Sequence, residues 1–428
     1  MERLMQYIWQ HRLWLQSDMR TVDGQVVQVI DPGRLNTDAG PDFFNAKIQI
    51  DGRMWAGDVE IHVKASDWHR HGHDGDQAYD SVVLHVVDRD DTVIRRSNGE
   101  PIPQLRMPCA PQFHLSYESL VNRADRDLPC AAKIAEMKPL YLRDWLDTLA
   151  YERIYDKSDR IHQLLQRYSG DWESTCYATV ARCLGFGVNG EPFERLALSL
   201  PLIFLGKHSD SITAIEALLF GQSGLLDTAS HNDDYVQRLR NEYTFLAHKF
   251  GLRAPQSLGW KMSRMRPGNF PHRRIATLAA MLHGGFRMLA RILKVTDLTE
   301  AESLFTPTLT GYWANHYNFG TPSPNTPSAL SCTSIQGLVI NAVVPLQFAY
   351  GMTHDDSELT DRAITLLQYI PAERNSIVEL FTRNGIKISD AFSSQALIQL
   401  RRQYCETRKC LYCRIGHRML AAQARRRD

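Results

Sequence analysis

Apolar residues near the beginning of the chain recur every three or four positions, and the spacing then changes to alternation. Residues 4–15 show the first spacing, which predicts an amphipathic helix. Two β-rich stretches follow, and they contain the pairs Asp23-Gly24 and Asp51-Gly52, which are typical of two-residue hairpin turns. The pattern therefore predicts one helix followed by an antiparallel meander.

Two later stretches predict strands of different burial. In residues 57–65 aliphatic side chains alternate with ionisable ones from Asp58 to Lys64, so all the ionisable groups lie on one face. Residues 81–88 are almost continuously apolar, which is typical of a strand covered on both faces.

From about residue 138 the helical spacing returns and continues through most of the chain. We therefore expect an α+β protein. A mixed sheet with flanking helices would occupy residues 1–108, a linker 109–137, and a large all-α region 138–428. The apolar periodicity recurs at 140–168, 193–205, 211–220, 233–250, 273–294, 335–350, 358–370, 375–384 and 394–424.

The composition is that of a globular chain with more than one domain. The 428 residues are 43% hydrophobic and 23% charged, with 49 Lys and Arg against 48 Asp and Glu. The charges are unevenly distributed. Residues 1–107 carry 17 acids and 12 bases, residues 251–294 nine bases and no acid, and residues 400–428 nine bases and two acids. This asymmetry is expected if nucleic acid binds the helical region.

The sequence also favours a cytoplasmic location. The first residues lack the apolar stretch of a signal peptide, and no run of eighteen apolar residues predicts a membrane span. Eight cysteines are too few for a disulfide framework in a chain of this length, which indicates a reducing compartment.

Candidate chemistry lies in the predicted sheet. Asp42, at a strand start, and Glu60, on the polar face of a neighbouring strand, can converge on one divalent ion, with the Ile61 carbonyl as a further ligand. A polar group two residues farther on would lie beside the metal-bound water, as in metal-assisted phosphodiester hydrolysis. Alternatively, Asp42 caps a loop and the polar face needs no ligand.

The order of helix, meander, Pro-Asp, Glu-x-basic and strand resembles the PD-(D/E)XK nuclease core over residues 1 to about 90. This resemblance implies a restriction-endonuclease-like fold for the N-terminal domain. The resemblance implies that Asp42 and Glu60 bind Mg²⁺ and that a lysine two residues after the glutamate acts on the water. His62 stands at that position, and Lys64 lies about 6.6 Å farther along the strand. Either His62 or Lys64 performs this role, or the site has lost it.

The chain as a whole resembles an uncharacterised bacterial family that is common in Bacteroidetes. The resemblance rests on TVDGQ, NTDAGPDFFNAKI, GDVEIHVKASDWHRHGHD, LHVV and RMRPGNFPHRRIA, and it covers essentially the full length. It implies a fixed architecture and no particular activity.

A histidine-rich loop follows the Glu60 strand. His69, His71 and His73 alternate in a Gly-containing stretch with carboxylates close behind. They could orient the ligands of one ion or bind a second, or they could form a solvated loop. His85 lies inside an apolar strand, where a hydrogen-bonded core histidine is expected.

Arginines cluster around a Pro-Gly-Asn turn that precedes a predicted helix. Arg264, Arg266, Arg273 and Arg274 are suited to phosphate oxygens, because guanidinium groups and free N–H groups at a helix start both bind anions. The same residues could instead pair with acids of other helices.

Cysteines gather near the C-terminus. Cys405, Cys410, Cys413 and His417 match the ligands of a structural zinc, provided that the chain turns near 406–409. On one unbroken helix Cys405 would face away, and the cysteines would be core packing. An iron–sulfur cluster would replace His417 with a distant thiol. The distant thiols are Cys109, Cys130, Cys176, Cys183 and Cys332.

The chain contains no phosphate-binding loop, dinucleotide fingerprint or G-x-S-x-G motif, so we expect no nucleotide or dinucleotide cofactor. The leading hypothesis is a Mg²⁺-dependent hydrolase that cleaves DNA or RNA and contacts the phosphate backbone through its arginines and basic C-terminal helix. The alternative is a non-catalytic nucleic-acid-binding or protein-binding scaffold that retains a nuclease fold. The oligomeric state is not predicted.

Overall fold

The computed structural model divides the chain into two compact units. Unit 1 comprises Met1–Trp145, Glu379–Ile386 and Leu400–Asp428, and unit 2 comprises Leu146–Val378 and Lys387–Gln399. The structure describes residues 1–14, 18–36, 38–109, 114–115, 117–118, 128–134, 136–227, 233–320 and 322–424. Most of the predicted linker at 109–137 lies outside these ranges.

The C-terminal segment belongs to the same unit as the sheet, although the sequence analysis grouped it with the helical region. The reason is hydrophobic packing. Leu411 and Leu420 are buried in the cluster that also contains Leu4 and Ile61. Burial of such side chains is the main favourable contribution to folding, so the segment folds with the sheet.

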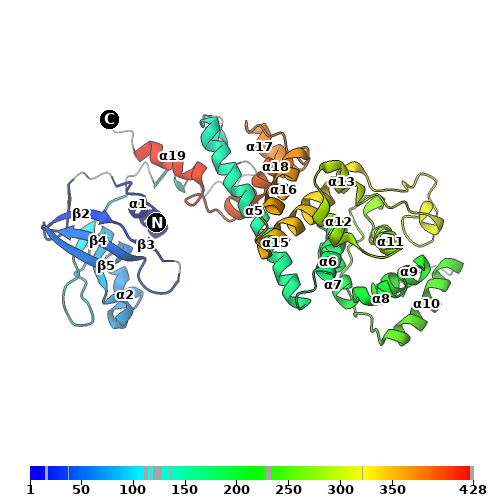
Figure 1. The fold of residues 1–428 in the computed structure, drawn as a ribbon. Helices are drawn as coiled ribbons and strands as arrows, with labels where there is room; N and C mark the ends of the chain where they lie inside the picture. Colours follow the sequence, from blue (N-terminus) through cyan, green and yellow to red (C-terminus); the bar gives the residue numbers. More distant parts are fainter. Residues whose placement is uncertain are drawn as a thin grey trace. The chain divides into compact units, whose positions relative to one another are not determined.

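Unit 1 is built on a mixed sheet of order β1-β2-β4-β5-β6-β7, with β3 paired to β4 (Figure 1). The pairs from β1 to β5 are antiparallel, whereas β6 runs parallel to β5 and β7 parallel to β6. The strands are β1 (Met19–Arg20), β2 (Val26–Asp31), β3 (Arg34–Leu35), β4 (Phe43–Ile50), β5 (Arg53–Lys64), β6 (Val82–Arg89) and β7 (Gln104–Arg106).

Both predicted hairpins are confirmed. Strands β1 and β2 are joined through Gly24, whose φ is +90°. Strands β4 and β5 are joined by Asp51 and Gly52, with φ values of +46° and +83°, and Ile50 pairs with Arg53. Two consecutive residues with positive φ are what a two-residue hairpin of this kind requires.

Helix α1 (Glu2–Gln10) covers one face of the sheet and ends before the predicted residue 15. Its apolar side chains share a buried cluster with Val59 and Ile61 of β5. The other face is covered by α2 (Asp67–Arg70), η1 (His73–Gly75) and η2 (Gln77–Tyr79), through a second cluster that includes Trp68 and Val87. The sheet is therefore covered on both faces where β5 ends.

Helices make up most of the chain after residue 130. They are α4 (Ala131–Ile134), α5 (Pro139–Arg167), α6 (Trp172–Leu184), α7 (Gly190–Ser199), α8 (Leu202–Gly206), α9 (Ile212–Gln222), α10 (Asp234–Phe250), η3 (Pro267–Asn269), α11 (Pro271–Leu282), α12 (Met288–Lys294), α13 (Leu298–Ser303), η4 (Gly311–Ala314), α14 (Cys332–Leu338), η5 (Val339–Val343), α15 (Val344–Thr353), α16 (Ser357–Tyr369), α17 (Ser376–Arg383), α18 (Ala391–Gln399), η6 (Leu400–Cys405) and α19 (Arg414–Ala424).

Three predicted helices are interrupted. The run 193–205 forms α7 and α8, because the chain is extended at Leu200 before Pro201. The run 273–294 forms α11 and α12, because Gly284 and Gly285 adopt φ values of +82° and +99° that end the first helix. The run 394–424 is broken by turns after η6. Helix α6 was not predicted, since buried side chains occupy most of its positions and leave no clear apolar stripe.

Within the described ranges, the stretch Cys332–Thr353 is long and apolar enough to cross a membrane by length and composition alone. It was missed in the sequence because polar residues such as Gln336 and Asn341 interrupt it. In the structure 67% of its apolar window is buried, as in the core helix of a globular domain.

Candidate metal centre

Asp42 and Glu60 are joined by reciprocal hydrogen bonds. The backbone N–H of Asp42 donates to Glu60 Oε2 at 2.9 Å, and the backbone N–H of Ile61 donates to Asp42 Oδ2 at 3.0 Å. Gln6 of α1 donates to Asp42 Oδ1 at 2.9 Å. The two predicted carboxylates therefore meet where α1, β4 and β5 come together. Ile61 contacts Asp42 through its N–H.

Burial makes this carboxylate pair electrostatically unfavourable. The pKa of Asp42 is raised to about 7, first because the side chain is desolvated and second because Glu60 lies close. The hydrogen bonds from Gln6 and Ile61 lower this pKa and only partly compensate. Two buried carboxylates without a cation cannot both ionise easily, and a bound cation would relieve the repulsion.

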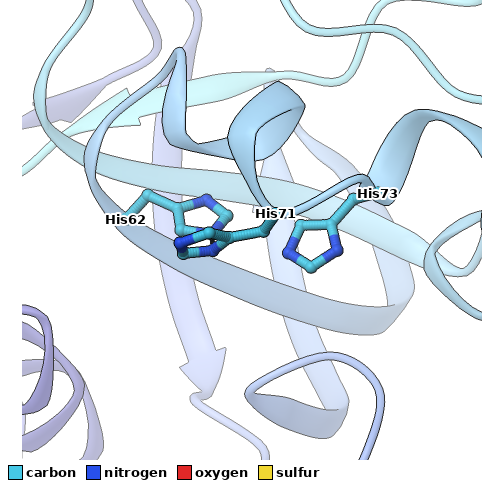
Figure 2. Close-up of side chains that lie close together, drawn as sticks. All are labelled: His62, His71 and His73. Atoms are coloured by element: carbon cyan, nitrogen blue, oxygen red, sulfur yellow. Dashed lines mark hydrogen bonds between the residues drawn. The ribbon is translucent and has the colours of Figure 1, made fainter.

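Three histidines complete the cluster. Glu60 Oε1 lies 3.4 Å from His62 Nε2 and 3.4 Å from His73 Nε2, while His62 Nε2 lies 3.1 Å from His71 Nδ1. One ligand nitrogen from each of the three histidines lies within 4.8 Å of the others, and Figure 2 shows the three rings gathered together. A carboxylate and three imidazoles thus converge on one small volume.

These separations match those between ligands of a single metal ion. Bonds of about 2.1 Å in tetrahedral geometry place ligand atoms about 3.4 Å apart. The contacts of Glu60 with His62 and His73 have this length, and the His62 to His71 contact is slightly shorter at 3.1 Å. Glu60, His62, His71 and His73 could therefore hold one ion, with His71 exposed to solvent at the edge of the site.

His62 also contacts His85 on its other side. The two rings meet through His62 Nδ1 and His85 Nε2 at 2.9 Å. The pKa of His62 is lowered to about 3 and that of His85 well below its usual value, in both cases first by burial and then by neighbouring imidazoles. Both rings are therefore neutral at physiological pH.

The expected core histidine, His85, thus belongs to the cluster. Its Nδ1 and the Nε2 of His73 are buried, and neither has a hydrogen-bond partner among the residues that the structure describes. A metal-bound histidine commonly donates its second ring N–H to a neighbouring acceptor, and His85 Nε2 is placed to be that acceptor for His62.

The conformation of the loop after β5 explains why His71 and His73 lie in the cluster. Asp67 anchors it, because its carboxylate accepts the Lys64 N–H at 3.0 Å and pairs with Arg70 at 3.0 Å. Gly72, with φ at +78°, then allows a reversal between His71 and His73. Tyr79 stacks on the His73 ring with centroids 3.8 Å apart.

Two predicted residues lie away from the cluster. His69 pairs with Asp74 at 2.8 Å on the surface of the loop. Lys64 is exposed at the end of β5, whereas His62 is fully buried beside Glu60. Of the two residues considered for acting on the water, only His62 is placed at the carboxylates.

The predicted nucleic-acid-binding arginines divide into two pairs. Arg273 is buried, and its guanidinium donates to the backbone carbonyls of Trp313, His316 and Pro327. Arg274 is also buried. It donates to Asn269 Oδ1 at 2.6 Å and stacks over Phe186 at 4.5 Å.

Arg273 and Arg274 are thus used inside unit 2 and are not available to phosphate, which corrects the sequence expectation for these two residues. Their position on the buried face of α11 is the physical reason. Arg264 and Arg266 are exposed, so their phosphate contacts stay a prediction.

The C-terminal cysteines meet in a cavity of unit 1. Cys405, Cys410 and Cys413 line it together with Cys130. Burial raises the pKa of Cys130 to about 12 and that of Cys410 to about 11. The chain turns between η6 and α19, so the unbroken helix considered in the sequence analysis does not form.

His417 does not line the cavity of the four thiols. Its Nδ1 lies 2.6 Å from the Tyr7 hydroxyl, and its ring packs against His11 with centroids 4.6 Å apart. Although it is only four residues from Cys413, the helical turn between them directs its side chain toward α1. In the structure Cys130 therefore takes the place that the sequence analysis gave to His417 beside the other three cysteines.

Comparison with known proteins bears on the family and not on the chemistry. No curated protein and no solved structure matches the chain. A family model described as a protein of unknown function, DUF2851, matches residues 2–376. The chain belongs to the DUF2851 family.

Proposed function

We propose that unit 1 is a metal-dependent phosphodiesterase that cleaves DNA or RNA. The observation that carries the proposal is the reciprocal bonding of Asp42 and Glu60, which joins the two carboxylates beside three imidazoles. The strand order gives further support. Helix α1, the antiparallel strands β2, β4 and β5, helix α2 and the parallel strand β6 follow one another as in the PD-(D/E)XK core.

The donor set favours a different ion from the Mg²⁺ that the nuclease resemblance implies. Mg²⁺ prefers oxygen ligands in octahedral geometry, whereas imidazole suits Zn²⁺ and related transition ions. Glu60, His62, His71 and His73 supply one oxygen and three nitrogens. We therefore propose Zn²⁺ or Mn²⁺ as the ion of this site.

A bound ion of this kind lowers the pKa of water and neutralises charge on a phosphate. The residues of the chain have separate tasks. Glu60, His62 and His73 would hold the ion, the solvent-exposed His71 would leave the fourth position to water during the reaction, and His85 would fix the orientation of the His62 ring. Asp42 lies beside Glu60 and would supply a second carboxyl group that can exchange a proton with the reacting atoms.

The test is a cleavage assay of the purified full-length chain on labelled single-stranded and double-stranded DNA and on RNA. The protein is treated with EDTA and then given Mn²⁺, Zn²⁺ or Mg²⁺. We expect cleavage with Mn²⁺ or Zn²⁺ and none with EDTA. Glu60→Gln should lower the rate by about a hundredfold or more, because it removes both a ligand and a charge. Glu100→Gln, at an exposed glutamate of the same unit, is the matched control.

The non-catalytic scaffold is the second candidate. The observation that favours it is that Asp42 and Glu60 already accept backbone N–H groups and that His62 is fully buried, as in a purely structural polar core. A folded protein that binds Mn²⁺ or Zn²⁺ at Glu60 and cleaves none of the substrates would contradict the phosphodiesterase and support the scaffold.

A further inference from the structure

We propose that Cys130, Cys405, Cys410 and Cys413 bind an iron–sulfur cluster. The proposal concerns a second site of unit 1 and does not depend on the phosphodiesterase. Its starting point is that these four thiols, one of them nearly three hundred residues from the others in sequence, line one cavity.

The spacing of the cysteines is the first argument. Three of them follow the pattern Cys-x4-Cys-x2-Cys, and the fourth comes from a distant part of the chain. This is a spacing found in iron–sulfur proteins, in which thiolates complete the coordination of each iron. The structure supplies the distant ligand as Cys130 and excludes His417, which bonds to Tyr7.

The cavity is the second argument. Its volume is about 30 Å³, which exceeds the roughly 10–15 Å³ that one water needs. A single tetrahedral zinc would occupy only the point about 2.3 Å from each of four sulfurs. A cluster contains inorganic sulfide as well as iron and therefore needs a larger volume between the thiols.

The remaining lining residues favour soft metal chemistry. They are Pro129, Leu400, Tyr404, Ile415 and Gly416. None of these described residues offers a carboxylate or an imidazole, so sulfur is the only strong ligand in the described lining of the cavity. Thiolates select zinc, copper and iron–sulfur clusters over hard cations. The mostly apolar surroundings would also limit access of water to the cluster.

The local backbone is shaped to present the sulfurs. The turn after η6 includes Arg408, whose φ of +55° is rare for a residue with a side chain. At the start of α19, a Cβ at Gly416 would collide with the carbonyl oxygen of Cys410, so glycine is required where the helix approaches the loop. The N–H groups of Ile415 and Gly416 donate to the Cys413 sulfur, as is common for metal-bound thiolates.

The test is anaerobic purification of the full-length chain, with reconstitution by Fe³⁺, sulfide and a thiol reductant if needed. Iron, acid-labile sulfide and zinc are then measured per chain, together with the visible absorption. We expect about two to four iron atoms with matching sulfide, and a charge-transfer band in the visible range. Binding should release the thiol protons to solvent as the iron–sulfur bonds form.

Variants locate the site. Cys130→Ser and Cys413→Ser should each lower the bound iron by about tenfold or more. Cys109→Ser is the matched control, because Cys109 packs against the same hydrophobic core but lies outside the cavity lining. His417→Ala should also retain the iron.

Three outcomes would overturn the proposal: one zinc per chain without sulfide, a disulfide among the four cysteines, or a protein that stays free of iron after reconstitution. All three outcomes are measured on the unmutated chain, so the test remains valid even if a variant fails to fold. Glu60→Gln should retain the cluster, which separates a failure here from a failure of the proposed phosphodiesterase.

Discussion

Buried polar side chains have opposite surroundings in the two units. In unit 2 the buried Arg273 donates to three backbone carbonyls, and the buried Glu194 pairs with Arg160 and Arg182. In unit 1 the buried Glu60 lies beside another carboxylate, and His62 lies between two other imidazoles. Buried charged side chains in unit 2 therefore have complementary partners, whereas those in unit 1 lie beside groups of the same kind.

This difference separates structural polar groups from functional ones. A buried charge with a complementary partner is explained by the folded chain itself. A cluster of like groups raises the free energy of the fold, and a cation bound as proposed above would lower that free energy. The pKa of Asp42 is raised and that of His62 is lowered, first by burial and then by these like neighbours.

The largest effect should come from breaking a complementary set. Arg273→Ala would leave buried carbonyls, including those of Trp313 and Pro327, without a donor. We expect the free energy of unfolding of unit 2 to fall by about 3 kcal/mol or more, measured by chemical denaturation. Arg266→Ala, at an exposed arginine, should change it by no more than about 0.5 kcal/mol. Equal losses in the free energy of unfolding for the two substitutions would show that the burial of Arg273 does not determine its contribution to stability.

Completing the incomplete cluster should stabilise unit 1. Addition of Mn²⁺ to EDTA-treated protein, at about a hundred times its Kd, should raise the free energy of unfolding by about 2.7 kcal/mol. His73→Ala should abolish this gain, because His73 lies 3.4 Å from Glu60. His69→Ala is the control, since His69 pairs with Asp74 outside the cluster. Calorimetry with and without metal measures the effect, and a gain that persists in His73→Ala would place the ion elsewhere.

A smaller effect tests a single buried carboxyl group in unit 2. Burial raises the pKa of Glu216 to about 7, although the Tyr235 hydroxyl donates to its carboxylate at 2.8 Å. Between the unfolded value near 4.5 and the folded value near 7, only the unfolded chain releases the proton, so stability should fall as pH rises. The expected slope is about 1.4 kcal/mol per pH unit.

Glu216→Gln removes the titrating group and should remove this part of the slope between pH 5 and pH 7. Thermal unfolding of both proteins across this pH range measures it. A slope that is unchanged by the substitution would assign the pH dependence to other groups.

The smallest effect concerns the exposed arginines. If Arg264 and Arg266 contact phosphate, replacing both with alanine should weaken nucleic-acid binding and flatten its dependence on salt concentration by about one unit of slope per lost contact. Fluorescence anisotropy at several salt concentrations measures both quantities. Unchanged affinity and slope would remove these residues from the binding surface, and stability should change by no more than about 0.5 kcal/mol.

Local features of the fold could be predicted from the sequence because they depend on neighbouring residues. The Asp51-Gly52 hairpin is one example, since its left-handed turn is encoded by the two residues themselves. The approach of Asp42 to Glu60 could also be predicted, because they belong to adjoining strands. The interruption of the predicted helix at Gly284 and Gly285 was readable in principle, as adjacent glycines disfavour a helix.

Tertiary features could not be predicted in the same way. The loop that carries His71 and His73 folds back over β5, and nothing in its alternating pattern distinguishes these residues from the exposed His69. Five distant cysteines could have joined the C-terminal three, and only the packing of the chain selects Cys130. Arg273 differs from Arg266 by lying on the buried face of a helix, which depends on the neighbours that α11 acquires in the fold.

The contact between Tyr7 and His417 has a consequence for the order of events during synthesis. Helix α1 and the sheet leave the ribosome first, but Leu411 and Leu420, which complete their core, follow only after all of unit 2. Until then the nascent chain must expose the apolar surface that these leucines later cover, which makes it a substrate for chaperones. The contact between Tyr7 and His417 closes a loop of 410 residues, which slows the final docking of the C-terminal segment onto the sheet. A chain released before this segment is made would therefore lack a stable N-terminal unit.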